Sequence, residues 1–116
     1  RSEDVLIYRN EDVLPRAYTL PATEVENHNG SIILPVTVDR SRIGAVELLS
    51  YDDLEVRLRA HLPEPGYLLL ADLYYPGWRA RVDGQAVAVL CADTVFRAVR
   101  LEPGEHLVSF TYRFVP

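Results

Sequence analysis

The chain has 116 residues, of which 48% are hydrophobic and 25% are charged, and its formal net charge is −5. These values fit one globular domain that can bury a core without disulfides. The acidic balance argues against nucleic acid as a partner, because a nucleic-acid binder needs a basic face. No apolar run approaches the roughly 20 residues that cross a bilayer. Because the chain starts at Arg1 and not at Met, we expect residues 1–116 to be one soluble domain excised from a longer protein.

The N-terminal half carries short strand signals separated by polar turns. The segment Glu26–Ser31 has the composition of a loop, and Asp52–Asp53 fall in a turn. Pro35 interrupts one apolar segment, which places that strand at a sheet edge or a bulge. The segments predicted as strands are Val5–Arg9, Ala17–Leu20, Ile32–Val38 and Gly44–Tyr51.

Alternation of apolar and polar residues is much clearer in the C-terminal half. Leu54–Leu62, Trp78–Asp83 and His106–Val115 each alternate with a period of two. This period predicts strands of antiparallel sheets that bury one face and expose the other. The run Tyr67–Tyr75 is more continuously apolar and predicts a further strand.

Turn residues separate these strands. Asp83–Gly84 predicts a two-residue hairpin, because both residues tolerate the positive φ that such a turn requires. Pro103–Gly104 suits a type II turn, Pro63–Gly66 separates two strands, and Pro76–Gly77 bends the chain before Trp78. About nine short strands without a helical stripe predict an antiparallel β-sandwich, jelly-roll or Ig-like, with little or no helix.

Tyr74, Tyr75 and Trp78 form the most conspicuous aromatic group. Such rings can stack on sugars, but they can equally fill a core. Trp78 shares strand parity with Ala80 and Val82, so we expect it to point inward. The two tyrosines are consecutive and must face opposite sides of a regular strand, so at least one of them is expected to be exposed.

Asp72 is the acidic residue whose setting calls for an explanation, since the run around it is apolar. It is either paired with an arginine or part of a site, and we favour the pairing. A pair of carboxylates flanking a cleft would indicate a glycosidase, but the other acids are scattered or explained by turns.

Metal and nucleophile chemistry find no support in the sequence. His28, His61 and His106 lack metal-ligand spacing and are expected to be solvated. Cys91 is the single cysteine and lies in an apolar run, which predicts a buried small hydrophobe. No nucleophile elbow or phosphate loop occurs. We therefore expect no catalytic residue, no metal and no cofactor.

Six arginines are expected on the solvent faces of strands. If two strands align, their guanidinium groups form a stripe that can bind phosphate or uronate groups. The alternative, which we favour, is cross-strand pairing with acids such as Glu47 and Glu55. The arginines are Arg57, Arg59, Arg79, Arg81, Arg97 and Arg100.

Two blocks of the chain resemble a known family. The order D-x-Y-Y-P-G-W, V-D-G, R-A-V and P-G-x-H, followed by an aromatic strand ending in Pro, resembles the C-terminal end of the YfhO family of bacterial membrane proteins. The upstream segment Asn10–Ala17 is similar to the N-x-x-x-L-P-R-A segment of the same region. The matching residues include Asp72, Tyr74–Trp78, Val82–Gly84, Arg97–Val99, Pro103, Gly104, His106, Tyr112 and Pro116.

The resemblance implies a domain on the extracytoplasmic face of a bacterial membrane, within a large polytopic protein related to the GT-C glycosyltransferases. Its partner would be its own transmembrane domain, and its catalytic acid would lie outside this chain. The motif residues are expected to shape hairpins. The resemblance also suggests that His106 hydrogen-bonds the neighbouring strand.

These observations predict a non-catalytic domain that binds or positions a cell-envelope glycan or a lipid-linked sugar. Tyr74 or Tyr75 would stack on the ligand, and Arg79 and Arg81 would meet its acidic groups, with Asp72 as a further candidate. The alternative is a structural module that packs on its own membrane domain or forms a homodimer.

Overall fold

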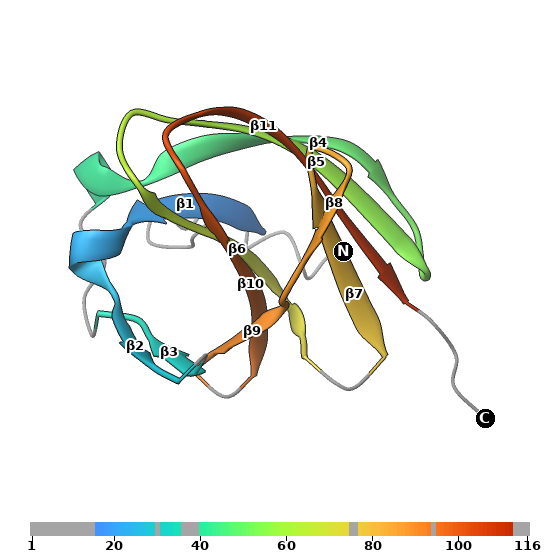
Figure 1. Ribbon diagram of the computed structural model, residues 1–116, viewed down its shortest axis with the longest axis horizontal. Coiled ribbons are helices and arrows are strands. Elements are labelled where there is room, and N and C mark those ends of the chain that lie inside the picture. Colours follow the sequence, from blue (N-terminus) through green and yellow to red (C-terminus); the bar gives the residue numbers. More distant parts are fainter. Residues whose placement is uncertain (1–15, 30, 36–39, 75–76, 94, 113–116) are drawn as a thin grey trace, which may run out of the picture.

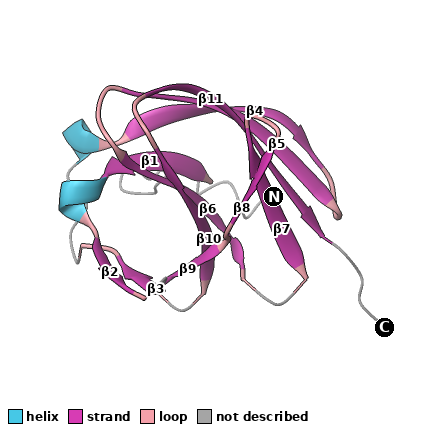
Figure 2. Ribbon diagram, in the orientation of Figure 1, coloured by secondary structure: helices cyan, strands magenta, loops and turns pink. Residues whose placement is uncertain are grey.

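The computed structural model describes residues 16–29, 31–35, 40–74, 77–93 and 95–112. Over these ranges the chain is all-β, with eleven strands in one mixed sheet and two short 3-10 helices (Figures 1 and 2). No helix in the described ranges is long and apolar enough to span a bilayer. The elements are β1 (Ala17–Pro21), η2 (Ala22–Glu24), β2 (Glu26–His28), β3 (Ser31–Ile33), η3 (Arg40–Arg42), β4 (Gly44–Tyr51), β5 (Glu55–Leu62), β6 (Gly66–Leu73), β7 (Trp78–Val82), β8 (Gln85–Val87), β9 (Leu90–Ala92), β10 (Phe96–Leu101) and β11 (Gly104–Tyr112).

The strand order is β2-β3-β9-β10-β6-β1-β4-β5-β11-β7-β8. Neighbours are antiparallel except β3 and β9, which are parallel. β1 joins the two halves of the sheet, because it pairs with β6 along its whole length and with β4 only at Tyr18 and Thr19. The sheet curls so that β5, β11 and β7 face β6 and β10 across a shared core (Figure 1).

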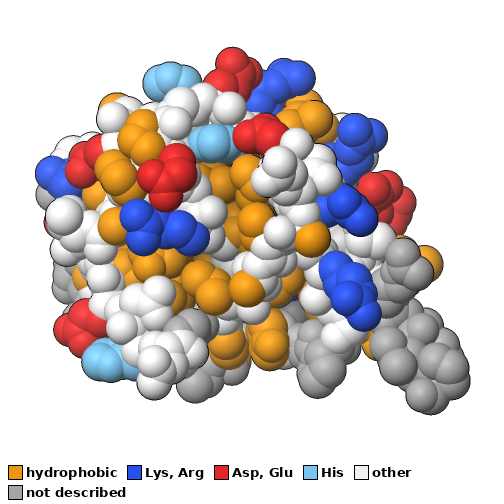
Figure 3. Space-filling model, in the orientation of Figure 1, with side chains coloured by type: hydrophobic (Ala, Val, Ile, Leu, Met, Phe, Trp, Pro, Cys, Tyr) orange, Lys and Arg blue, Asp and Glu red, His pale blue; other side chains and the backbone are white. Residues whose placement is uncertain are grey.

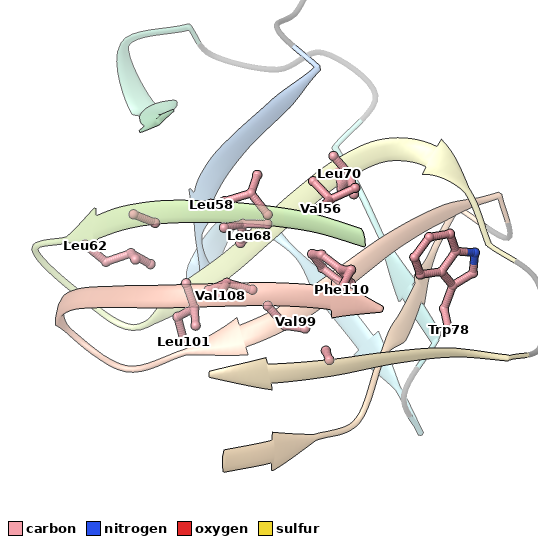
Figure 4. Close-up of a cluster of buried hydrophobic side chains, with 12 residues drawn as sticks. Val56, Leu58, Leu62, Leu68, Leu70, Trp78, Val99, Leu101, Val108 and Phe110 are labelled. Atoms are coloured by element: carbon pink, nitrogen blue, oxygen red, sulfur yellow. The ribbon is translucent and has the colours of Figure 1, made fainter. Parts of the chain in front are cut away.

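The main core lies inside this curl and follows from the alternation seen in the sequence (Figure 4). Along β5 every second residue is buried, and the intervening residues are exposed. β11 contributes Val108 and Phe110 from the same side, while β10 contributes Val99 and Leu101 from the other. Burial of such side chains is worth about 1.5–3 kcal/mol each, which is enough to order short strands.

β6 is buried on both faces. Leu68 and Leu70 point into the main core, whereas Tyr67 and Leu69 belong to a second cluster with Tyr18 on the opposite face of the sheet. A strand covered on both sides needs apolar residues at every position. This requirement explains the apolar run from Tyr67 to Leu70, which stops where Ala71 is exposed and Asp72 follows.

The turn predictions are confirmed locally but not always as hairpins. Asp83 and Gly84 have φ values of 53° and 85° and join the paired strands β7 and β8. Gly104 also has positive φ, at 115°. However, β10 pairs with β6 and β9, while β11 pairs with β5 and β7. The Pro103–Gly104 turn therefore carries the chain from one half of the sheet to the other, as Pro63–Gly66 does between β5 and β6.

The all-β class and the near absence of helix agree with the sequence prediction, whereas the finer prediction is not confirmed. The described ranges contain eleven strands against the nine expected for the chain, and these strands form one continuous, unclosed sheet instead of two separate ones. The loop expected at Glu26–Ser31 contains β2, which pairs with β3. The strand expected at Ile32–Val38 ends at Ile33. The strand expected at Val5–Arg9 lies outside the described residues.

Gly66 occupies a position where β6 passes very close to β1. A Cβ at this position would lie 2.4 Å from the Leu20 carbonyl oxygen, closer than real Cβ contacts allow. We therefore expect Gly66→Ala to lower the free energy of unfolding by about 1–3 kcal/mol, the usual cost of overpacking. Urea denaturation would measure this loss, with exposed Ser50→Ala as the control. Equal stability of the two variants would show that β1 can move away from β6 freely.

Candidate functional site

Asp72, near the end of β6, is held by three side chains. Its Oδ1 accepts a hydrogen bond from Arg16 Nη1 at 2.5 Å, and its Oδ2 accepts one from Tyr51 Oη at 2.8 Å. Arg97 Nη2 lies 3.4 Å from the same Oδ2. The predicted pairing of Asp72 with arginine is therefore confirmed. We call these four residues the Asp72 network.

Arg97 is the buried member of the Asp72 network, with 4% of its surface exposed. Its guanidinium lies 3.7 Å from the centroid of Trp78 and 5.8 Å from that of Phe110. A cation over an aromatic face is attracted by the ring quadrupole, and more so when it is desolvated. The prediction that Arg97 faces solvent is wrong, because Arg97 shares strand parity with Val99 and Leu101 of the main core.

Tyr51 and Arg16 close the Asp72 network at the surface. Arg16 Nη1 also donates to Tyr51 Oη at 3.1 Å, and its guanidinium lies 5.0 Å from the Tyr51 ring centroid. The hydrogen bond to Asp72 raises the pKa of Tyr51 above its ordinary value, because the carboxylate favours the protonated phenol. Sequence reasoning missed both residues, since they lie 21 and 56 positions from Asp72 and no local pattern links them to it.

The Asp72 network borders a small hollow of about 250 Å³, whose other walls include Asp52, Asp53 and Trp78. Both oxygens of Asp72 already accept hydrogen bonds. A general acid or base must reach the proton that it transfers, so this arrangement suits a tie between strands better than proton transfer. The described residues contain no group of three His, Cys, Asp or Glu side chains placed to hold a metal ion.

A second polar cluster lies on the outer face of β5, β11 and β7. Ser109 of β11 pairs with Arg57 of β5 on one side and with Arg81 of β7 on the other. Two residues further along β11, Thr111 pairs with Arg79 of β7. All three guanidinium groups are exposed. We call these five residues the arginine face, and Figure 3 shows blue side chains along this side of the molecule.

The arginine face differs from the other arginines in its charge partners. Arg59 is paired with Glu47 and Glu105, and Arg100 with Glu102. The favoured prediction of cross-strand pairing with acids is therefore confirmed for Arg59, whereas the partner of Arg100 lies only two residues along the chain. By contrast, Arg57, Arg79 and Arg81 form no ion pair with any residue in the described ranges. The strand alignment required for a basic stripe is thus present.

Arg79 and Arg81 line a hollow of about 640 Å³. It opens where β8 ends at Val87 and the chain leaves the edge of β7, and its floor includes Thr111 and residues 86–89. Two arginines and one threonine, Arg79, Arg81 and Thr111, are thus among the residues that line this hollow. Arg81 Nη1 donates to the Gly84 carbonyl oxygen at 3.0 Å, which fixes its direction.

The predicted aromatic residues separate into a core residue and a surface residue. Trp78 is 8% exposed, and its ring centroid lies 5.4 Å from that of Tyr112. Tyr74 is 38% exposed, and its backbone amide donates to Val95 at 2.6 Å. Tyr74 is not among the residues that line the hollow beside Arg79 and Arg81. Tyr75 and Pro76 lie outside the described residues.

The histidines also behave differently from one another. His28 and His61 are exposed, as expected, but the prediction of a solvated His106 is wrong. Its Nδ1 lies 2.7 Å from Asp83 Oδ2, and its Nε2 lies 2.7 Å from the Glu102 carbonyl oxygen. The hydrogen bond suggested by the family resemblance thus exists, but its partners are two turns and not a strand. Cys91 on β9 is half-buried.

The contacts of His106 shift two pKa values. Burial alone would lower the pKa of His106, but the bonds to Asp83 and to the Glu102 carbonyl outweigh it and raise the pKa above 6.5. The Asp83 carboxylate accepts hydrogen bonds from the Leu107 amide and from His106, and these hold its pKa below 3.8. Both shifts follow from hydrogen bonds to the charged forms.

Comparison of the chain with protein-family models, with curated proteins and with solved structures finds no match.

Proposed function

We propose that this chain is a non-catalytic β domain that binds or positions an acidic cell-envelope glycan or a lipid-linked sugar. In this proposal it works on the extracytoplasmic face of a bacterial membrane, beside the transmembrane part of a larger glycosyltransferase-like protein. The resemblance to the YfhO family supports that setting. The jelly-roll or Ig-like sandwich expected from the sequence stays a prediction. The observation that carries the proposal is the arginine face.

The spacing of the arginine face suits an anionic ligand with more than one charged group. Arg57 and Arg81 flank Ser109, and two strand spacings place their Cα atoms about 10 Å apart. Arg79 lies two residues from Arg81, about 7 Å along β7. Guanidinium groups bind carboxylate and phosphate oxygens bidentately. The hydroxyl of Ser109 between them can donate to the same group or to a sugar oxygen.

The non-catalytic character is supported by the state of the acids. Each oxygen of Asp72 accepts a hydrogen bond from another member of its network, and Asp52 Oδ1 accepts from the backbone amides of Leu54 and Glu55. A retaining or inverting glycosidase needs two carboxyl groups facing a sugar across a cleft. The charged side chains that line the hollow beside β7 are Arg79 and Arg81, which can bind an anion but do not cleave a glycosidic bond.

A titration with trigalacturonate tests the proposed function, with neutral maltotriose as the control ligand. We expect trigalacturonate to bind, and Arg79→Gln/Arg81→Gln to weaken binding at least tenfold, because a hydrogen bond to a charged group contributes about 1.5–3 kcal/mol. Isothermal titration calorimetry measures both constants. The matched control is Arg100→Gln on β10, which removes one surface charge away from the arginine face.

A loss of binding free energy in Arg100→Gln that is half the loss in the double variant, which removes two charges, would show that only net charge matters. Failure of trigalacturonate and of pyrophosphate, as a second anion, to bind the unmodified domain would remove the arginine face as a site.

A structural module is the second candidate, and one observation favours it. Leu48, Leu49, Tyr51 and Leu54 are 38–59% exposed on β4 and the turn that follows it. Exposed apolar side chains close together mark protein or membrane contacts. Sedimentation of the isolated domain would distinguish the two functions. A concentration-dependent dimer that Leu48→Asp/Leu54→Asp abolishes, together with no anion binding, would favour the structural module.

A further inference from the structure

His106 makes two contacts that only its charged form can satisfy together. The Glu102 carbonyl oxygen 2.7 Å from Nε2 can only accept, so Nε2 must carry a proton. The Asp83 carboxylate oxygen 2.7 Å from Nδ1 is also an acceptor. A neutral imidazole has one N–H group and would leave two lone pairs facing each other at one of these contacts. The geometry therefore requires an imidazolium.

The same carboxylate fixes the end of the β7–β8 hairpin. Asp83 Oδ1 accepts from the Leu107 amide at 2.9 Å, and the Asp83 amide donates to the Leu107 carbonyl at 2.8 Å. Arg81 is tied in turn to the carbonyl of Gly84, the next residue of the turn. A displacement of Asp83 thus also moves Gly84, whose carbonyl oxygen directs the Arg81 guanidinium.

We propose that the His106 imidazolium is a pH-dependent latch. It holds the β7–β8 hairpin against β11, and the turn of this hairpin in turn fixes the direction of the Arg81 side chain. When the latch opens, anion binding at the arginine face weakens. Only this consequence rests on the proposed function.

The surroundings of His106 contain few other charges. Asp83 faces it from the β7–β8 turn, and Glu102 faces it from the β10–β11 turn, where Arg100 pairs with the Glu102 carboxylate. On β5 the residue opposite His106 is Ala60. The other charged groups nearby, Arg59, His61 and Glu105, are exposed on the outer face of β5 and β11. Proton loss from His106 is therefore the event that opens the latch as the pH rises.

The direction of the pH effect follows from the two shifts. The pKa of His106 is raised above 6.5, so its contribution is complete below that pH and is lost as the pH rises through the raised pKa. The pKa of Asp83 is lowered below 3.8, so its contribution is present above that pH and is lost as the pH falls through the lowered pKa. The latch is closed between these two limits.

The test measures the protection factor of the Leu107 amide by hydrogen exchange at pH 6 and pH 9, corrected for intrinsic exchange, without ligand. We expect protection to fall severalfold at pH 9 in the unmodified domain. Asp83→Asn is the key variant, because Asn tolerates the positive φ of this turn and can still accept from the Leu107 amide, but it offers no charge to His106. Its protection is expected to be the same at both pH values.

Trigalacturonate affinity at the same two pH values tests the consequence. We expect about a fivefold loss or more at pH 9, as is typical of coupling between sites, and little loss in Asp83→Asn. Protection that does not depend on pH would overturn the latch, whatever binds. Affinity that falls equally in Asp83→Asn would overturn it as well, since the charge of His106 alone would explain that result. If protection of the Leu107 amide depends on pH but no anion binds, the latch is upheld and only the proposed function is contradicted.

Discussion

Asp72→Asn is expected to lower the free energy of unfolding by about 3 kcal/mol, because it leaves the Arg97 guanidinium without its carboxylate. Arg97 has a side chain only 5% exposed, and that of Asp72 is 13% exposed. A charge in this environment has lost most of its hydration, and the remaining Asn can supply only a neutral oxygen. Urea denaturation at pH 7 measures the loss, provided that the slope with denaturant stays constant.

Two further variants make this result specific. Asp53→Asn removes a nearby but exposed carboxylate and is expected to change stability by less than about 0.5 kcal/mol. Asp72→Asn/Arg97→Met removes the buried charge together with its partner. Since apolar replacement of a whole buried pair is often close to neutral, this double variant is expected to be more stable than Asp72→Asn alone. A double variant less stable than Asp72→Asn would mean that the Arg97 stack on Trp78 matters more than the ion pair.

The sequence predicts an element well when a pattern within a few consecutive residues determines its structure. β5 alternates along its whole length, and its four apolar residues are all buried. The Asp83–Gly84 hairpin was predicted equally well, because positive φ at two successive positions leaves few residue choices. In both cases the physical cause lies within a few residues of the effect, so the sequence alone reveals it.

Pairing between distant strands could not be predicted in this way. Pro103–Gly104 has the composition of a hairpin turn, yet it crosses between the two halves of the sheet. Turn residues fix only the local φ and ψ values, whereas the partner of the next strand depends on which apolar faces must be covered. The short strand β2 was missed for a related reason, since three residues are too few to show a period.

The candidate site was predicted in part. Arg79 and Arg81 lie on an exposed face as expected, and the register of β11 supplies Arg57 as their neighbour. Arg97 was placed on the wrong face although Arg100 was placed correctly. The two residues are three positions apart, so a regular strand must direct them to opposite faces. Val99 and Leu101 were the local signal that could have assigned Arg97 to the core.

Trp78→Ala is expected to lower the free energy of unfolding by about 3–5 kcal/mol, the range found for buried aromatic residues. The indole is 8% exposed and packs against the Tyr112 ring and the Arg97 guanidinium. Its loss leaves a cavity at the end of the main core (Figure 4) and removes the cation–π contact. Chemical denaturation measures the change, followed by circular dichroism because the variant lacks tryptophan fluorescence. Tyr74→Ala, at the more exposed ring of the same motif, is the matched control and is expected to cost far less.

The combination Trp78→Ala/Asp72→Asn then shows whether the two residues act through Arg97. Groups that share a partner are not additive, so the double variant is expected to lose less stability than the sum of the single losses. Additive losses would separate the indole from the ion pair. If Tyr74→Ala cost as much as Trp78→Ala, the assignment of Trp78 to the core and of Tyr74 to the surface would be contradicted. With the indole committed to the core, ligand contact has to come from the arginine face or from Tyr74, and the anion titration separates these two.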